Sequence, residues 1–138
     1  MKIVFICWLL IIPFVLVAQT NNTNFMFTHQ YKNCTIRSNC NVEEQASYKG
    51  GCVPMMENIG KHLRYPKEML HKKQEGTVKV LIVLQSNGEI GSTKIIESTD
   101  AIFSNSVENA INQLKNFKPA SNKDCITEYE FTLHFKIK

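Results

Sequence analysis

The sequence contains none of the short motifs that usually mark an active site. It has no Ser-x-x-Lys, Gly-x-Ser-x-Gly or His-Glu-x-x-His pattern and no phosphate-binding loop. Its five cysteines form no Cys-x-x-Cys pair, and its four histidines are not spaced as metal ligands usually are. We therefore expect no catalytic residues, no metal and no cofactor, and a protein that is not an enzyme.

A strong surplus of one charge is also missing. The chain has 16 basic and 12 acidic residues, which gives a formal net charge of +4. The nearest basic clusters, Lys61 to Arg64 and His71 to Lys73, are what the solvated face of a helix would carry. The charge pattern thus argues against a nucleic-acid partner.

The N-terminus has the pattern of a targeting segment. Lys2 precedes an uncharged apolar run from Ile3 to Ala18, and a polar stretch follows. About 16 residues are short for a helix that crosses a bilayer, which needs about 20. We expect residues 1–18 to be a signal peptide cleaved near Ala18, which places the protein in the periplasm or outside the cell. The alternative is an uncleaved anchor of residues 3–18 in the inner membrane.

The remaining cysteines predict disulfides. Loss of Cys7 with the signal leaves Cys34, Cys40, Cys52 and Cys125, an even number in an exported chain. Of the three possible pairings, Cys34–Cys40 with Cys52–Cys125 is the most economical, because Cys34 and Cys40 close a small local loop. A zinc site is the competing interpretation, which the ligand spacing disfavours.

Composition divides the exported part in two. Residues 19–46 are rich in Asn, Thr, Ser and Gln and show neither helical nor strand periodicity, which predicts a polar, mobile segment. A breaker at residues 48–51 then precedes the folded part. We expect one domain over residues 47–138.

Three stretches of this domain predict helices. Apolar residues at helical spacing predict a helix from Val53 to Leu63, which Tyr65 and Pro66 end. Pro66 suits the first turn of a short second helix that reaches about Lys73. An apolar stripe from Phe103 to Leu114 predicts one long helix, and Thr99, Asp100 and Ser104 are its candidate caps.

Three further stretches predict strands. Thr77 to Gln85 is aliphatic or β-branched on both faces, which predicts a central strand covered on both sides. Asn87-Gly88 predicts a hairpin turn, and Ile90 to Ser98 the returning strand. The last segment alternates strictly from Glu128 to Ile137, as a half-buried antiparallel strand does. The fold expected is two-layer α+β, with a three-stranded antiparallel sheet, one long packing helix and one or two short N-terminal helices.

The order of the turn and boundary residues resembles the C-terminal domain of the TonB energy-transducer family. Six segments carry the resemblance in the family's order: Gly50-Gly51, Leu63-Arg64-Tyr65-Pro66, Glu75-Gly76-Thr77-Val78, Asn87-Gly88-Glu89-Ile90, the helix of Val107 to Leu114, and Phe117-Lys118-Pro119. In these segments Gly50, Gly51, Tyr65, Pro66, Gly76, Gly88, Phe117 and Pro119 are expected to have structural roles. Gly76 and Gly88 suit tight turns.

The resemblance also implies a partner. In the family the last strand pairs with a short peptide of an outer-membrane receptor and so serves transmembrane transport. The matching edge here carries Thr127, Glu128, Glu130, Thr132, His134 and Lys136. However, residues 1–18 lack the Ser and His of a motor-coupled anchor, and residues 19–46 contain no proline for a long spacer. The alternative is therefore a structural or self-associating envelope protein, possibly a homodimer.

Overall fold

The computed structural model describes residues 34–138, so the predicted signal peptide, its cleavage site and the alternative anchor lie outside the described residues. The elements follow in the order β1 (Thr35–Ser38), β2 (Ser47–Tyr48), α1 (Cys52–His62), α2 (Lys67–His71), β3 (Gly76–Leu84), β4 (Ile90–Ser98), α3 (Ala101–Ile111), β5 (Phe117–Lys118) and β6 (Thr127–Phe135). The helices and the long strands correspond to the predicted segments, with limits that differ by a few residues. The three short strands β1, β2 and β5 were not predicted.

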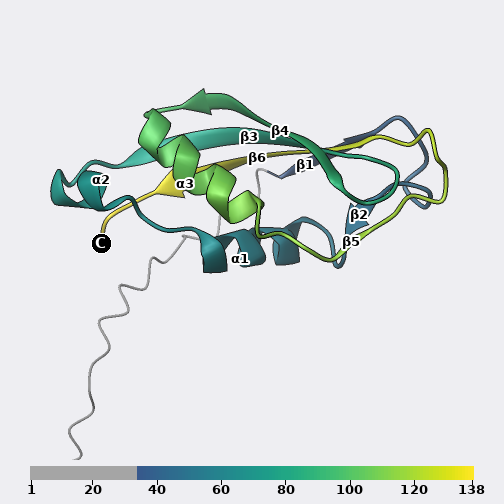
Figure 1. The fold of residues 1–138 in the computed structure, drawn as a ribbon, viewed down its shortest axis with the longest axis horizontal. Helices are drawn as coiled ribbons and strands as arrows, with labels where there is room; N and C mark the ends of the chain where they lie inside the picture. The colour runs from purple at the N-terminus through teal and green to yellow at the C-terminus, as the bar shows by residue number, and fades with distance from the viewer. Residues whose placement is uncertain (1–33) are drawn as a thin grey trace, which may run out of the picture.

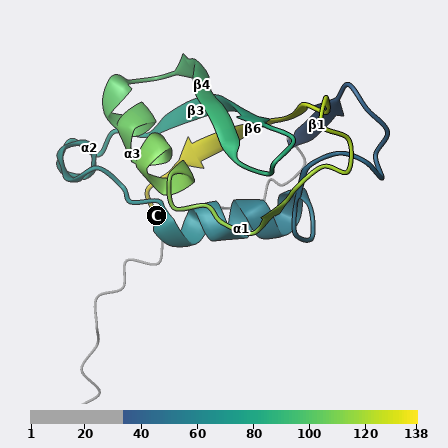
Figure 2. The ribbon, with the colours of Figure 1, turned by 45° about the vertical axis from the view of Figure 1, so that its right-hand side comes forward.

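An antiparallel sheet forms one layer and the helices the other. The strand order is β1-β6-β3-β4, and β2 and β5 pair separately. The helices α1 and α3 lie on the same side of the sheet (Figures 1 and 2). The predicted two-layer α+β fold is confirmed, with four strands in the sheet instead of three because β1 joins it.

The core lies between this sheet face and the helices. Every second residue of β3 and β6 is buried, including Val80, Ile82, Tyr129 and Phe131. On the other face of β3, Leu81 and Val83 are only half-buried, since both helices pack on the opposite side. The predicted cover over this second face is therefore absent among the described residues.

Local sequence explains where α3 begins and which face it buries. The Asp100 side chain accepts a hydrogen bond of 2.8 Å from the backbone N–H of Ile102 and caps the helix. Phe103 and Val107, four positions apart, point into the core with no exposed surface. The predicted stripe is thus the packing face of α3.

Several of the boundary residues hold the sheet and helices together. The buried ring of Tyr65 packs edge-on against Phe103 and Phe135, with centroids 5.8 and 5.5 Å away, and its hydroxyl donates to the Gln74 carbonyl. Pro66 directly precedes α2. The predicted role of this pair at a helix boundary is what the structure shows.

The glycines and the second aromatic corner serve backbone geometry. Gly50 and Gly51, with φ of 90° and 85°, connect β2 to α1. Gly88 has φ of 84° in the β3–β4 turn, and a Cβ there would lie 3.1 Å from the Pro119 nitrogen. Phe117 in β5 packs edge-on against Tyr48 at 5.1 Å. The β3–β4 turn at Gly88 and the segment that follows β5 at Pro119 therefore lie against each other, although they are far apart in the sequence.

Gly76 is needed for a different reason than the predicted tight turn. It begins β3 without a positive φ, and a Cβ on it would lie 2.6 Å from Cδ2 of the buried Phe103 and closer still to Cε2. The Phe103 ring of α3 thus packs directly against the backbone of β3 at Gly76.

The predicted disulfide pairing is wrong, although all four cysteines form disulfides. The bonds are Cys34–Cys52 and Cys40–Cys125. Because β1 runs antiparallel along β6, the end of β1 lies beside the start of β6, and this brings Cys40 to Cys125. The residues between Cys34 and Cys40, which were expected to form a small loop, form the extended strand β1 instead.

Candidate functional site: the last strand

The strand β6 divides its side chains between the core and the outer face of the sheet. Of the predicted binding residues, Glu128, Glu130, Thr132 and His134 lie half-buried on the outer face. Thr127 is fully buried on the inner face, where its Oγ1 has no hydrogen-bond partner among the described residues. Lys136 lies beyond the end of the strand and is exposed. The Thr127 side chain is therefore unavailable to a partner.

The direction of the backbone groups along β6 follows from hydrogen bonds at its two ends. The Ile126 N–H and C=O bond to Asn39 on the β1 side, at 2.8 and 3.3 Å. The Ile137 N–H bonds to the Glu75 side chain on the β3 side, at 2.9 Å. Backbone groups alternate in direction along a strand, and the β3–β6 register has no shift. Even-numbered residues of β6 thus point their N–H and C=O groups away from β3.

The first half of this side is already occupied, so β6 is not an edge strand there. The strand β1 pairs with residues 127–130, placing Thr35 opposite Glu130 and Arg37 opposite Glu128. The prediction of an edge along the whole last strand was wrong because β1 was expected to be part of a mobile segment. Four mostly exposed residues have too short a pattern to reveal a strand.

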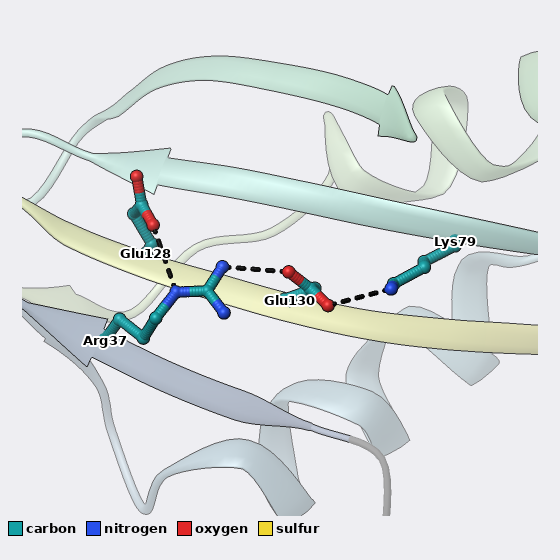
Figure 3. A network of polar contacts seen from close by, with 4 residues as sticks. All are labelled: Arg37, Lys79, Glu128 and Glu130. Carbon is teal, nitrogen blue, oxygen red and sulfur yellow. Dashed lines mark hydrogen bonds and ion pairs between the residues drawn. The ribbon is translucent and has the colours of Figure 1, made fainter. Parts of the chain in front are cut away.

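Ion pairs join the three neighbouring strands on the outer face (Figure 3). Arg37 Nε lies 3.3 Å from Glu128 Oε2, and its Nη2 lies 2.8 Å from Glu130 Oε2. Lys79 Nζ of β3 lies 3.0 Å from Glu130 Oε1. The hydrogen bond from Arg37, followed by that from Lys79, lowers the pKa of Glu130, and the Glu130 hydrogen bond is the main cause of the raised pKa of Arg37.

These contacts explain what the two predicted carboxylates do. In the described structure Glu128 and Glu130 both pair with Arg37 of β1, so their carboxylates already have a partner within the domain. Arg37 and Lys79 were not predicted as site residues. The only sequence signal for Arg37 was its place in the short β-favouring run Thr35 to Ser38, between two cysteines.

Within residues 34–138, the second half of β6 has no strand on the side away from β3 and is called the open half below. Residues 131–135 pair with residues 76–80 of β3, and no other strand within residues 34–138 pairs with them. The backbone groups of Thr132 and His134 point to this open side. The His134 Nε2 is buried without a partner in the described part of the chain. An extended peptide could add here as a further strand.

The opposite edge of the sheet is less suited to strand addition. The strand β4 has two register shifts against β3, next to Val80 and next to Leu84. Such bulges interrupt the regular row of backbone groups and twist the strand away from a partner. The open half of β6 has no such irregularity.

Residues 34–138 hold neither a cluster of metal-ligating side chains nor a helix of membrane-spanning length and hydropathy. No group of three or more His, Cys, Asp or Glu side chains is arranged to hold a metal ion. No helix in this range is both long enough and apolar enough to span a membrane.

Comparison with known proteins gives a family match and a similar solved structure. Residues 61–137 match the family described as Gram-negative bacterial TonB protein C-terminal. A solution NMR structure of the Pseudomonas aeruginosa TonB C-terminal domain is similar, with 29% sequence identity and a TM-score of 0.47, covering 55% of this chain and 79% of that chain. No curated protein matches the chain. On the family match, the chain belongs to the TonB C-terminal domain family.

Proposed function

We propose that this chain is a periplasmic binding module that pairs the open half of β6 with a peptide of an outer-membrane receptor and so takes part in transport across the outer membrane. The family is one of non-enzymatic interaction domains of the cell envelope. Two disulfides fit the oxidising periplasm. These properties support the compartment and the mode of binding.

The observation that carries the proposal is the direction of the Thr132 and His134 backbone groups. They offer donors and acceptors to an added strand without disturbing the β3–β6 ladder, while the inward residues Phe131 and Leu133 stay committed to the core. Each added main-chain hydrogen bond contributes only about 1 kcal/mol net. A footprint this short therefore predicts modest affinity, with Thr132 and His134 side chains adding selectivity.

The variant Thr132→Pro tests this directly. Proline at this position removes one of the two N–H groups that point to the open side, that of Thr132, and keeps that of His134. It also leaves intact every hydrogen bond between β3 and β6. Thr132→Val is the matched control, because it changes the side chain and keeps the N–H. We expect Thr132→Pro to weaken receptor binding about fivefold or more, the equivalent of one lost hydrogen bond, and Thr132→Val to bind nearly as wild type.

The measurement is capture of outer-membrane receptors from envelope extracts, with and without a competing receptor peptide. Circular dichroism must show that both variants are folded. Undiminished capture by folded Thr132→Pro protein would rule out strand addition along this half of β6. The structural or self-associating envelope protein would then become the better hypothesis.

Location can be tested separately by intact mass. We expect protein recovered from the envelope to lack residues 1–18, because the apolar run is short and ends in Val17 and Ala18 before a polar stretch. A mass that retains these residues would favour the membrane anchor instead.

A further inference from the structure

We propose that the first half of β6, from Thr127 to Glu130, is a second peptide-binding edge that recognises an arginine-bearing extended segment. In the described structure β1 occupies this edge in cis, and reduction of the two disulfides opens it to exchange. The inference takes strand addition from the proposed function as its mode of binding, but it concerns a different part of the edge and a different ligand.

The strand β1 is attached to the domain much as a bound peptide would be. Three of its four residues are exposed and none belongs to the core, and its largest apolar side chain, Ile36, is 37% exposed. Its noncovalent contacts with the domain include the main-chain pairing with β6, the ion pairs of Arg37, and a contact of 3.9 Å between Ser38 Oγ and Cys125 Sγ. Asn39, the residue after the strand, adds hydrogen bonds with Ile126 and with the Asp124 carbonyl. Apart from the strand pairing, these are exposed or part-buried polar contacts, which oppose its removal only weakly.

The pair Glu128 and Glu130 provides the selectivity of this edge. The two carboxylates lie two positions apart on the same face, and the Arg37 guanidinium bonds to both. Guanidinium offers several donors in a fixed plane, so one arginine can bond to both carboxylates at once, here at 3.3 and 2.8 Å. A neutral residue in this place would leave the two carboxylates side by side without their shared partner. The edge thus fits an extended segment whose arginine stands opposite Glu128.

The disulfides bracket β1 at both ends. Cys34 directly precedes the strand and is bonded to Cys52, the first residue of α1. Cys40 follows the strand and is bonded to Cys125, just before β6. A four-residue edge strand held only by hydrogen bonds and exposed ion pairs is marginal in water. Covalent clamps at both ends keep it paired.

Reduction removes the clamps without cutting the chain. A protein dithiol of the envelope would attack each disulfide through a mixed disulfide, and two electrons and two protons would pass to the pair of cysteines. Each exchange leaves two thiols in this chain and one disulfide in the reductant. The released β1 stays connected through the residues that lead to β2, so it competes with any peptide that replaces it.

Hydrogen exchange resolved by residue tests the release of β1. The amides of Glu128 and Glu130 point to β1, whereas those of Tyr129 and Phe131 point to β3. On reduction with a phosphine, confirmed by thiol titration, we expect exchange to become about tenfold faster or more at Glu128 and Glu130 only. Unchanged exchange would show that β1 stays bound without its clamps. Equal acceleration of all four amides would show that the disulfides hold the whole domain together. Either result overturns the proposal.

A partly clamped variant provides an independent readout. Cys34→Ser with Cys52→Ser opens only the first clamp and keeps Cys40–Cys125. We expect exchange to rise at Glu130, which pairs near the freed end, and to change less at Glu128. Equal exchange rates at Glu128 and Glu130, or rates no faster than in the wild type, contradict the proposal that the disulfides keep β1 paired with β6.

Binding in trans tests the ligand. The probe is a labelled, blocked peptide with the sequence of residues 35–39, and its control has alanine in place of the arginine. We expect the reduced protein to bind the probe at least several-fold more tightly than the control, and the oxidised protein to bind neither. Binding that ignores the arginine, or that does not depend on reduction, overturns the proposal. No receptor enters these assays, so their failure is distinct from a negative result with Thr132→Pro.

Discussion

Replacing Gly76 by alanine should destabilise the domain through a single clash in the core. The added Cβ would lie 2.6 Å from Phe103 Cδ2, well inside the usual separation of about 3.5–4.0 Å between nonbonded carbons. The ring has no exposed surface and lies against Phe135, with centroids 4.6 Å apart, and against Tyr65. It cannot move aside without disturbing both neighbours.

The magnitude follows from two opposing effects. Forcing one extra carbon into a packed core raises the free energy of the folded state by about 1–3 kcal/mol. Alanine also restricts the unfolded chain more than glycine does, which returns about 0.4–1 kcal/mol. The difference between the two effects is about 0–2.6 kcal/mol, and at the midpoints of the two ranges we expect Gly76→Ala to lower the free energy of unfolding by about 1.3 kcal/mol.

Gly91→Ala is the matched control, since Gly91 also lies in a strand and has no positive φ. Its added Cβ would meet Gln85 Cγ at 2.9 Å, but that side chain is flexible and exposed. We expect a change within about 0.5 kcal/mol. Urea unfolding measures both variants, and the midpoint should fall for Gly76→Ala at constant m-value. Equal stability of the two variants would refute the argument from the Phe103 ring.

Two further predictions concern single polar groups. The Tyr129 hydroxyl accepts a buried hydrogen bond of 3.0 Å from the Tyr48 N–H, so Tyr129→Phe should leave that donor unpaired and destabilise the fold by about 1–3 kcal/mol in urea unfolding; a loss near zero would mean that another acceptor takes its place. Since the pKa of Glu130 is lowered in the folded state, its contribution to stability is present above the pKa of the unfolded chain, near 4.5, and is lost as the pH falls through the folded pKa. Arg37→Gln should therefore raise the Glu130 pKa and flatten the acid limb of the stability curve, as followed by NMR titration of the carboxyl carbon, whereas an unchanged pKa would show that Arg37 is not its main cause.

Local patterns in the sequence were sufficient to predict the helices and the three long strands. Ile90 to Ser98 forms a strand with the predicted limits, because Asn87-Gly88 fixes where the hairpin turns. Asp100 caps α3 as expected of its side chain, and the alternation of β6 gives its buried face correctly. These features depend on residues close in sequence, which explains why the pattern alone was informative.

Features that depend on distant contacts could not be predicted in the same way. The strand β1 is defined by its pairing with β6, which is far away in the sequence, and not by its own period. Cys40 bonds to Cys125 because the pairing of β1 with β6 brings these two cysteines together. The prediction had paired Cys40 with Cys34 because that disulfide closes the shorter loop. Because β1 was missed, the candidate edge was predicted over the whole of β6, whereas among the described residues only its second half lacks a second strand. The role of Arg37 was missed for the same reason.

The strand order β1-β6-β3-β4 also determines when each part of the sheet can assemble. The hairpin of β3 and β4 joins neighbouring segments and can close as soon as both have been synthesised. Within residues 34–138 the strand β6 is the last element, and β1 has no ladder to join until β6 is in place. The first strand of this range is therefore the last to find its position, and the four-stranded sheet can be completed only after β6 has been synthesised.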